Sequence, residues 1–113
     1  MRIILSPDAE KTYKYFSEKA LVYKSDKMMI RAILYKMDFI IKDHNYGNPI
    51  RKDMLPAEYV QRYGIKNLYR VELLNFWRML YSINDDGDIE IIAFVLDIID
   101  HKTYNKKFGY RKG

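Results

Sequence analysis

The sequence contains no cysteine, and it has few of the other residues that define common active sites. Without cysteine, neither a disulfide framework nor a thiolate nucleophile is available. The two histidines, His44 and His101, are too few for a zinc site in a chain without thiolate ligands. No glycine-rich loop of the P-loop or dinucleotide-binding type is present. We therefore expect no metal and no small-molecule cofactor.

Long apolar runs are missing as well. No stretch approaches the roughly 20 apolar residues of a membrane-spanning helix. The apolar part of "MRIILSPDAE" is also too short for a signal peptide. We therefore expect a cytoplasmic protein that makes no use of a membrane. With 113 residues, of which 49% are hydrophobic, the chain is expected to form one domain over residues 1–113.

Acidic side chains are absent from one segment, residues 101–113. The whole chain has 20 Lys and Arg against 15 Asp and Glu, a net charge of +5. Five of the basic residues and none of the acidic ones follow position 100, so the preceding part is neutral. Tyr104, Phe108 and Tyr110 are interleaved with these cations. Basic residues mixed with aromatic ones are typical of segments that bind single-stranded nucleic acid, which predicts a polyanionic partner.

The first 21 residues have the pattern of a strand followed by a helix. Arg2–Leu5 is a short apolar run of the kind that forms a β-strand. Ser6 and Pro7 are the residue types preferred at a helix N-cap and at the first helical position. Apolar residues then recur at helical spacing, which predicts a helix that ends at about Leu21.

A second helix is expected after Ser25, which has the residue type of an N-cap. Apolar residues recur at helical spacing over residues 29–41, so the two helices would form an αα-hairpin with one apolar face each. "NYGNPI", at residues 45–50, is typical of a loop. Residues 56–63 favour one or two helical turns before Gly64.

The last third changes to the alternating pattern of strands. "NLYRVELL" and "FWRMLYSI" alternate, "NDDGD" predicts a turn, and "IEIIAFVLDII" is nearly all apolar. These segments predict a three-stranded antiparallel meander, followed by a short helix near residues 102–107. If Trp77 and Met79 face the helical hairpin, Arg70 and Arg78 share the opposite, open face of the sheet. The predicted order is β-α-α-β-β-β with a basic tail, an α+β fold.

Arginine, histidine and tyrosine together have the chemistry needed to cleave RNA without a metal ion. The ribose 2′-hydroxyl attacks its neighbouring phosphate, which requires a base, cations for the phosphorane and an acid for the leaving oxygen. Arginine binds phosphate through paired hydrogen bonds, histidine serves as acid or base, and tyrosine stacks on bases or exchanges a proton. The same residues also suit RNA binding alone, and Arg78 has an alternative partner in Glu72.

The element order and three motifs resemble the RelE/ParE superfamily of toxins from toxin–antitoxin systems. "NLYRVELLNFWRMLYSI" resembles the family's paired strands, and "GNPIRKDMLP" resembles the loop after the helical hairpin. "AFVLDIIDHKTYNKKFGY" resembles the last strand with its closing motif. The resemblance covers nearly the whole chain. It implies an N-terminal strand, an αα-hairpin packed on a small antiparallel sheet, and a short basic C-terminal helix or tail.

The resemblance to the RelE branch also implies an mRNA endoribonuclease. Such a toxin acts on the ribosome without a metal ion, inhibits translation and is silenced by a cognate antitoxin protein. Arg78 matches a strand arginine that binds the scissile phosphate, and His101 and Tyr104 match groups that transfer protons, as acid or base in either order. Substrate binding is expected from five basic residues: Arg70, Lys102, Lys106, Lys107 and Arg111.

One residue departs from the pattern of the RelE branch. Glu72 stands at a position that is often basic in that branch. Two alternatives therefore stand beside the nuclease. One is a non-catalytic inhibitor of a protein target such as DNA gyrase, as in the ParE branch. The other is an inactive relative that only binds nucleic acid.

Overall fold

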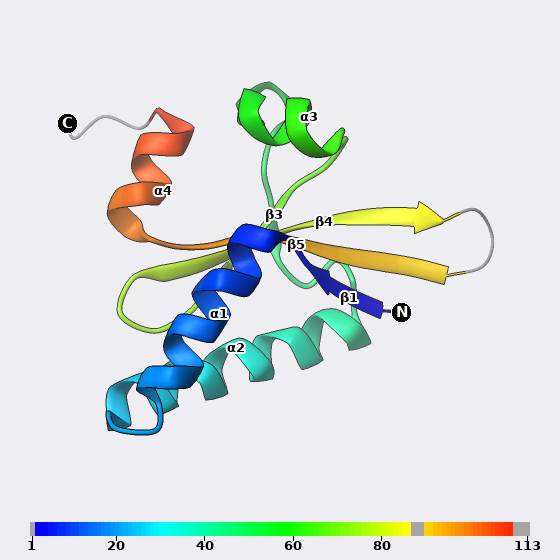
Figure 1. Cartoon of the computed structure of the whole chain (residues 1–113). Helices are drawn as coiled ribbons and strands as arrows, with labels where there is room; N and C mark the ends of the chain where they lie inside the picture. Colours follow the sequence, from blue (N-terminus) through cyan, green and yellow to red (C-terminus); the bar gives the residue numbers. More distant parts are fainter. Residues whose placement is uncertain (1, 87–89, 110–113) are drawn as a thin grey trace.

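The computed structural model describes residues 2–86 and 90–109, with the backbone alone at residues 85, 86, 90–94 and 96 (Figure 1). The fold is α+β, as predicted. Its elements in chain order are β1 Arg2–Leu5, α1 Pro7–Lys19, α2 Lys24–Lys42, β2 Asn48–Pro49, the 3₁₀-helix η1 Lys52–Met54, α3 Ala57–Tyr63, β3 Tyr69–Glu72, β4 Trp77–Asp86, β5 Glu90–Asp100 and α4 His101–Phe108.

The strands of the described residues form one sheet with the order β1-β5-β4-β3-β2. β3, β4 and β5 make the predicted antiparallel meander. β1, however, lies parallel to β5, and the two-residue strand β2 pairs with the outer edge of β3. The sheet is therefore mixed rather than purely antiparallel. This places the N-terminal strand next to the last strand of the chain. No local sequence pattern predicts this pairing, because the two strands are far apart in the chain.

The two helices of the hairpin begin in different ways. Ser6 caps α1 as predicted, because its Oγ accepts a hydrogen bond of 3.0 Å from the Ala9 N–H. Ser25 does not cap α2 and lies inside the helix. The carbonyl oxygen of Tyr23 already accepts a bond of 3.2 Å from the Lys27 N–H. The backbone after α1 continues to turn, so α2 starts before the serine, and the sequence signal for a cap was misleading here.

One face of the sheet packs against α1 and α2. Trp77 stands edge-on against Phe16 of α1, with ring centroids 4.9 Å apart. Met79 and Tyr81 point the same way from β4, which confirms the predicted facing of that strand. Each such buried side chain stabilises the fold by about 1.5–3 kcal/mol. The fully buried members of this first core are Ala9, Phe16, Met29, Ile33, Ile40, Val71, Met79, Tyr81, Val95 and Ile98.

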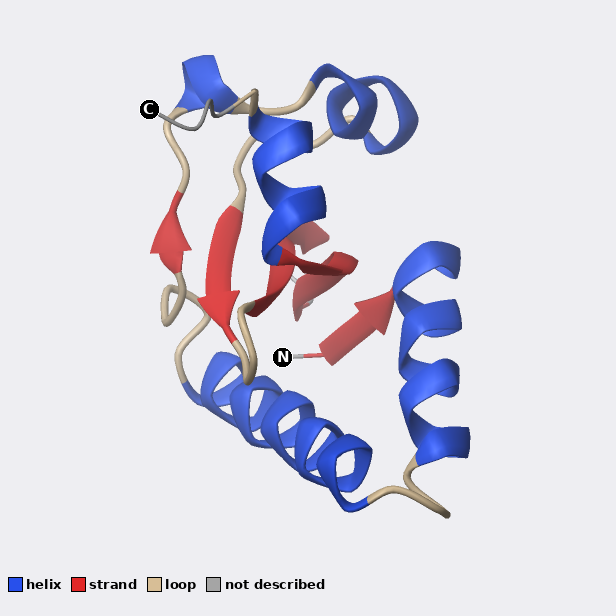
Figure 2. Cartoon of the chain, turned by 90° about the vertical axis from the view of Figure 1, so that its left-hand side faces the viewer, coloured by secondary structure: helices blue, strands red, loops and turns tan. Residues whose placement is uncertain are grey.

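The sequence analysis predicted that the opposite face of the sheet is open, and this prediction is wrong. α3 and α4 lie on that side (Figures 1 and 2) and enclose a second core of Tyr59, Ile65, Leu68, Leu80, Ile99, Tyr104 and Phe108. α3 ends at Gly64, where a φ of 61° suits glycine, as predicted. The C-terminal segment is therefore part of the folded domain as far as Phe108.

Tyr81 fastens the loop after α2 to the sheet. Its hydroxyl accepts a hydrogen bond of 2.8 Å from the Gly47 N–H and donates one of 3.0 Å to the carbonyl oxygen of His44. Burial raises the pKa of Tyr81 to about 12, so the hydroxyl stays protonated. This contact leaves no room at position 47, because an added Cβ would lie 2.9 Å from the Tyr81 ring and 3.0 Å from the Arg70 carbonyl oxygen.

We predict that Gly47→Ala lowers the free energy of unfolding by about 1–3 kcal/mol, the usual range for overpacking. The new methyl group would lie too close to a buried ring and to the backbone of β3, so one of them must shift. Urea unfolding followed by circular dichroism measures the effect, with Asn48→Ala at the exposed neighbouring position as control. Equal unfolding midpoints for Gly47→Ala and the wild type would contradict the proposed close contact.

Candidate functional site

Two arginines lie on neighbouring strands on the side of the sheet that carries α4. Arg78 of β4 pairs in register with Glu72 of β3, and Arg70 lies two residues before Glu72. Residues two apart in a strand share a face, so the three side chains lie together, as predicted for Arg70 and Arg78. The Arg70 side chain is 29% exposed and that of Arg78 only 14%. Both guanidinium groups are therefore held in place by their neighbours.

α4 begins beside Arg78 because β5 ends there. Asp100, the last residue of β5, pairs with Trp77, which precedes Arg78 in β4. Its Oδ1 caps the helix by accepting a hydrogen bond of 2.8 Å from the Thr103 N–H. That bond lowers the pKa of Asp100 below its usual value. The cap places His101 in the first turn of the helix, next to the arginine.

We predict that Asp100→Ala lowers the free energy of unfolding by about 1 kcal/mol near neutral pH, as for other lost N-caps. The folded-state pKa of Asp100 is depressed, so its contribution is present above the unfolded pKa of about 4 and is lost as the pH falls through the folded value. Unfolding in urea between pH 7 and pH 3 should therefore show the two proteins converging in acid. Asp100→Asn, which still caps, should stay near the wild type at pH 7. A difference that does not change with pH would rule out the carboxylate as its source.

Tyr104 lies at the centre of the site and is only 1% exposed. The guanidinium carbon of Arg78 lies 4.5 Å from the centre of its ring, and that of Arg70 lies 5.7 Å from it. Arg70 Nη1 donates a hydrogen bond of 3.2 Å to the Tyr104 hydroxyl oxygen. Phe108 stacks on the same ring at a centroid distance of 4.3 Å. The ring of Tyr104 therefore positions the two arginines and is too buried to stack on a base.

His101 contacts Arg78 directly. The distance from Arg78 Nη1 to His101 Nδ1 is 2.7 Å. Arginine has only hydrogen-bond donors, so Nδ1 must be the acceptor, and the neutral ring then has its proton on Nε2. Nε2 lies 3.1 Å from the side-chain amide nitrogen of Asn105. If the amide oxygen and nitrogen are exchanged by a flip of the side chain, the oxygen accepts the hydrogen bond from Nε2–H. The site thus holds an unprotonated imidazole nitrogen beside a guanidinium group.

Glu72 bridges the two arginines. Its Oε1 lies 3.1 Å from Arg70 Nε, and its Oε2 lies 3.2 Å from Arg78 Nε. The carboxylate is half exposed, so each ion pair contributes at most about 1 kcal/mol to stability. Its larger effect is to offset positive charge where an anion would bind. Arg78 therefore contacts both Glu72, the alternative partner that the sequence indicated, and His101.

Lys107, one of the predicted substrate-binding residues, has carboxylate partners within the fold. Its ammonium group binds Glu58 of α3 and lies 3.8 Å from Asp97 of β5. The Tyr59 hydroxyl donates a hydrogen bond of 2.8 Å to the same Asp97 carboxylate. Burial raises the pKa of Asp97, and the Tyr59 bond and the Lys107 charge act against that shift. Lys107 therefore joins α4 to α3 and β5.

The structure describes two of the other predicted substrate-binding residues. Lys102 and Lys106 occupy exposed positions on α4. Arg111 lies outside the described residues. Two residues near the site were missed by the sequence analysis: Asn105, which contacts His101, and Phe76, whose ring lies 6.0 Å from the His101 ring. The i to i+4 spacing of His101 and Asn105 on a short helix was the available signal for the first.

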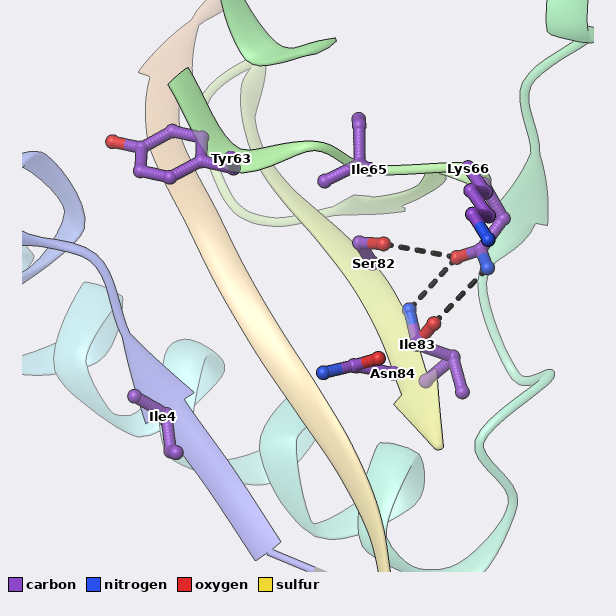
Figure 3. A pocket seen from close by; sticks show the side chains of 8 residues that line it. Ile4, Tyr63, Ile65, Lys66, Ser82, Ile83 and Asn84 are labelled. Carbon is purple, nitrogen blue, oxygen red and sulfur yellow. Dashed lines mark hydrogen bonds between the residues drawn. The ribbon is translucent and has the colours of Figure 1, made fainter. Parts of the chain in front are cut away.

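A pocket of about 350 Å³ is lined by none of these residues. It lies between β1, β4 and the connection from α3 to β3 (Figure 3). In its wall, Asn67 accepts a hydrogen bond of 2.8 Å from the Ile83 N–H, donates one of 3.0 Å to the Ile83 carbonyl oxygen and accepts one from Ser82 (Figure 3). The amide thus extends the pairing of β4 beyond the start of β3. Lys66 is the one charged residue among the described residues that line this pocket, so we place the candidate site at the arginine pair.

Comparisons with models of protein families, with curated proteins and with solved structures give no match to this chain. The described part of the chain contains no helix that is both long and apolar enough to span a membrane. It also contains no group of three or more His, Asp or Glu side chains placed to hold a metal ion. The function must therefore be inferred from the geometry around Arg78.

Proposed function

We propose that the protein is a RelE-like toxin, a cytoplasmic endoribonuclease of a toxin–antitoxin pair that cleaves mRNA on the ribosome. One observation carries the proposal: Arg78 contacts both His101 and Tyr104, while Arg70 contacts Tyr104. A phosphate-binding fork, an unprotonated imidazole nitrogen and a phenol thus lie within one cluster. These are the groups that 2′-hydroxyl attack on a phosphate requires. The order of elements from β1 to α4 also agrees with the resemblance to that family.

In this proposal the scissile phosphate binds the two guanidinium groups. It displaces the Glu72 carboxylate from Arg70 and Arg78, and it takes the Arg78 hydrogen bond that His101 now accepts. Substrate binding therefore frees the lone pair of His101 Nδ1. The base becomes available only when the phosphate is in place.

The cleavage step then moves two protons. The 2′-oxygen forms a bond to phosphorus as the bond to the 5′-oxygen breaks, and the 2′-hydroxyl proton passes to His101 Nδ1. In this proposal the Tyr104 hydroxyl, whose oxygen accepts a hydrogen bond from Arg70, gives its proton to the departing 5′-oxygen. The products are a 2′,3′-cyclic phosphate and a 5′-hydroxyl end. Arg70 and Arg78 balance the charge of the phosphorane.

The proposed antitoxin binds the helical hairpin. Large apolar side chains are exposed at the turn between α1 and α2 and along α2: Leu21, Val22, Tyr23, Met28, Leu34, Tyr35 and Ile41. Exposed apolar patches of this kind commonly mark protein–protein contacts. An amphipathic segment laid across them, with acidic residues reaching toward Arg70 and Arg78, would block both the ribosome and the site.

A second candidate follows from Glu72 and Tyr104. Glu72 offsets the charge of both arginines, and Tyr104 is almost fully buried. Both features favour a relative that binds without cleaving. Such a protein would be a ParE-like inhibitor of a target such as DNA gyrase, or a plain nucleic-acid-binding module.

We predict that Arg78→Ala reduces mRNA cleavage by at least about 10²-fold, the scale for losing a charge-stabilising donor in a transition state. The assay incubates purified protein with ribosomes stalled on a defined mRNA and maps new 5′ ends by primer extension. Arg31→Ala, at an exposed position on α2, is the matched control and should cleave like the wild type. Cleavage by Arg78→Ala at the wild-type rate would remove this residue from the mechanism.

Intact mRNA with folded wild-type protein would instead favour the second candidate. A gyrase supercoiling assay then separates its two forms. Inhibition of supercoiling that survives His101→Ala would support a ParE-like inhibitor. Salt-sensitive RNA binding without product and without an effect on gyrase would support the binding module.

We predict that Glu72→Gln strengthens the binding of single-stranded RNA by about five-fold. A carboxylate about 4 Å from a phosphate opposes it by about 1 kcal/mol even in water, and glutamine removes that charge at nearly constant size. Fluorescence anisotropy with a labelled oligonucleotide at fixed salt measures the change, with Glu18→Gln on α1 as control. Weaker binding by Glu72→Gln would show that Glu72 orders the arginines rather than opposing the phosphate.

A further inference from the structure

The turn between β3 and β4 has an unusual backbone. The Trp77 N–H donates a hydrogen bond of 3.0 Å to the Leu74 carbonyl oxygen, and the Leu73 N–H donates one of 2.8 Å to that of Trp77. The two central residues, Asn75 and Phe76, have φ angles of 53° and 64°. Positive φ at both central residues, with this hydrogen bond from Trp77 to Leu74, is the pattern of a type I′ turn. Asparagine is a favoured residue at its first central position.

Phenylalanine is a poor residue for the second central position, where glycine is preferred. A side chain with a β-carbon is strained in the left-handed region. Packing does not offset this strain, because Phe76 is 76% exposed. A large apolar ring is thus held in solvent on a strained backbone. Neither the turn nor the core accounts for its presence.

The position of Phe76 relative to the site suggests a reason. Its ring centroid lies 6.0 Å from that of His101, and the two planes are inclined by 52°. His101 in turn accepts a hydrogen bond from Arg78. The hairpin tip and the start of α4 lie at the same end of the sheet (Figure 1). Phe76 therefore borders the place where the proposed function puts the phosphate.

We infer that Phe76 is a stacking platform for an unpaired RNA base next to the phosphate bound by Arg70 and Arg78. This inference rests on the proposed function, because it takes RNA as the ligand. It adds Phe76 as a residue that holds the nucleotide. An exposed ring offers a π-face to any base, while the buried Tyr104 ring does not. A phenyl ring has no hydrogen-bonding group to read base edges, so this contact selects single-stranded RNA over duplex and has little preference among bases.

The test measures binding rather than cleavage. A short RNA with 2′-O-methyl groups throughout cannot be cleaved, and 2-aminopurine placed at one position at a time reports stacking through loss of its fluorescence. The proteins compared are the wild type, Phe76→Gly and Phe76→Trp, with Tyr15→Ala as a control for an exposed aromatic residue on α1. Phe76→Gly suits the positive φ, so its thermal unfolding midpoint should equal or exceed that of the wild type.

We expect Phe76→Gly to bind this RNA about ten-fold more weakly, the middle of the range for losing one base–aromatic stack. The fluorescence loss at one 2-aminopurine position should disappear with it, while Phe76→Trp and Tyr15→Ala keep both affinity and signal. A purely structural role would lower the unfolding midpoint of Phe76→Gly and leave the position-specific signal intact.

The outcomes separate this inference from the function on which it rests. If Arg78→Ala loses affinity in the same titration but Phe76→Gly does not, the stacking role is overturned and RNA binding stands. If the wild type binds no RNA, both are overturned. Binding with loss of signal in Phe76→Gly supports the stacking role even when the cleavage assay shows no product.

Discussion

The contact of Tyr104 with the sheet is the interaction on which the site depends. Its ring fills the second core together with Phe108, and its polar edge meets Arg70 while Arg78 lies over its face. The same burial that docks α4 therefore fixes both guanidinium groups. Because His101 lies one turn before Tyr104 in the helix, docking also sets its contact with Arg78. Hydrophobic packing, which has no direction of its own, here gives precise polar geometry.

The basic residues that give the chain its net positive charge are not the ones that supply the positive charge of the site. The basic excess lies entirely after position 100, yet Lys107 is held by Glu58 and Asp97. The site cations are two arginines from strands of the neutral part, and Glu72 bridges them. A phosphate would therefore bind the two arginines by replacing the Glu72 carboxylate. Such exchange favours specific placement more than raw affinity.

Local strain and unfavourable placement gather around the arginine pair. Phe76 combines a positive φ with an exposed ring, and Arg78 is largely buried beside an imidazole. The Ser6 cap and the glycine that ends α3, by contrast, follow ordinary rules. Departures from local stability that cluster in one place are typical of functional sites. The cluster here coincides with the groups proposed to bind RNA.

Patterns of period two and 3.6 determined much of the molecule from sequence alone. They were enough for the meander, the helical hairpin and the shared face of Arg70 and Arg78, and Gly64 indicated where α3 ends, because these features depend on residues a few positions apart. Only the tertiary structure decided that β1 lies parallel to β5, that α3 and α4 close the second face, and that Phe76 meets His101. It also decided which carboxylates bind Lys107. These features join residues distant in the chain, and local periodicity has no information about which distant partners will meet.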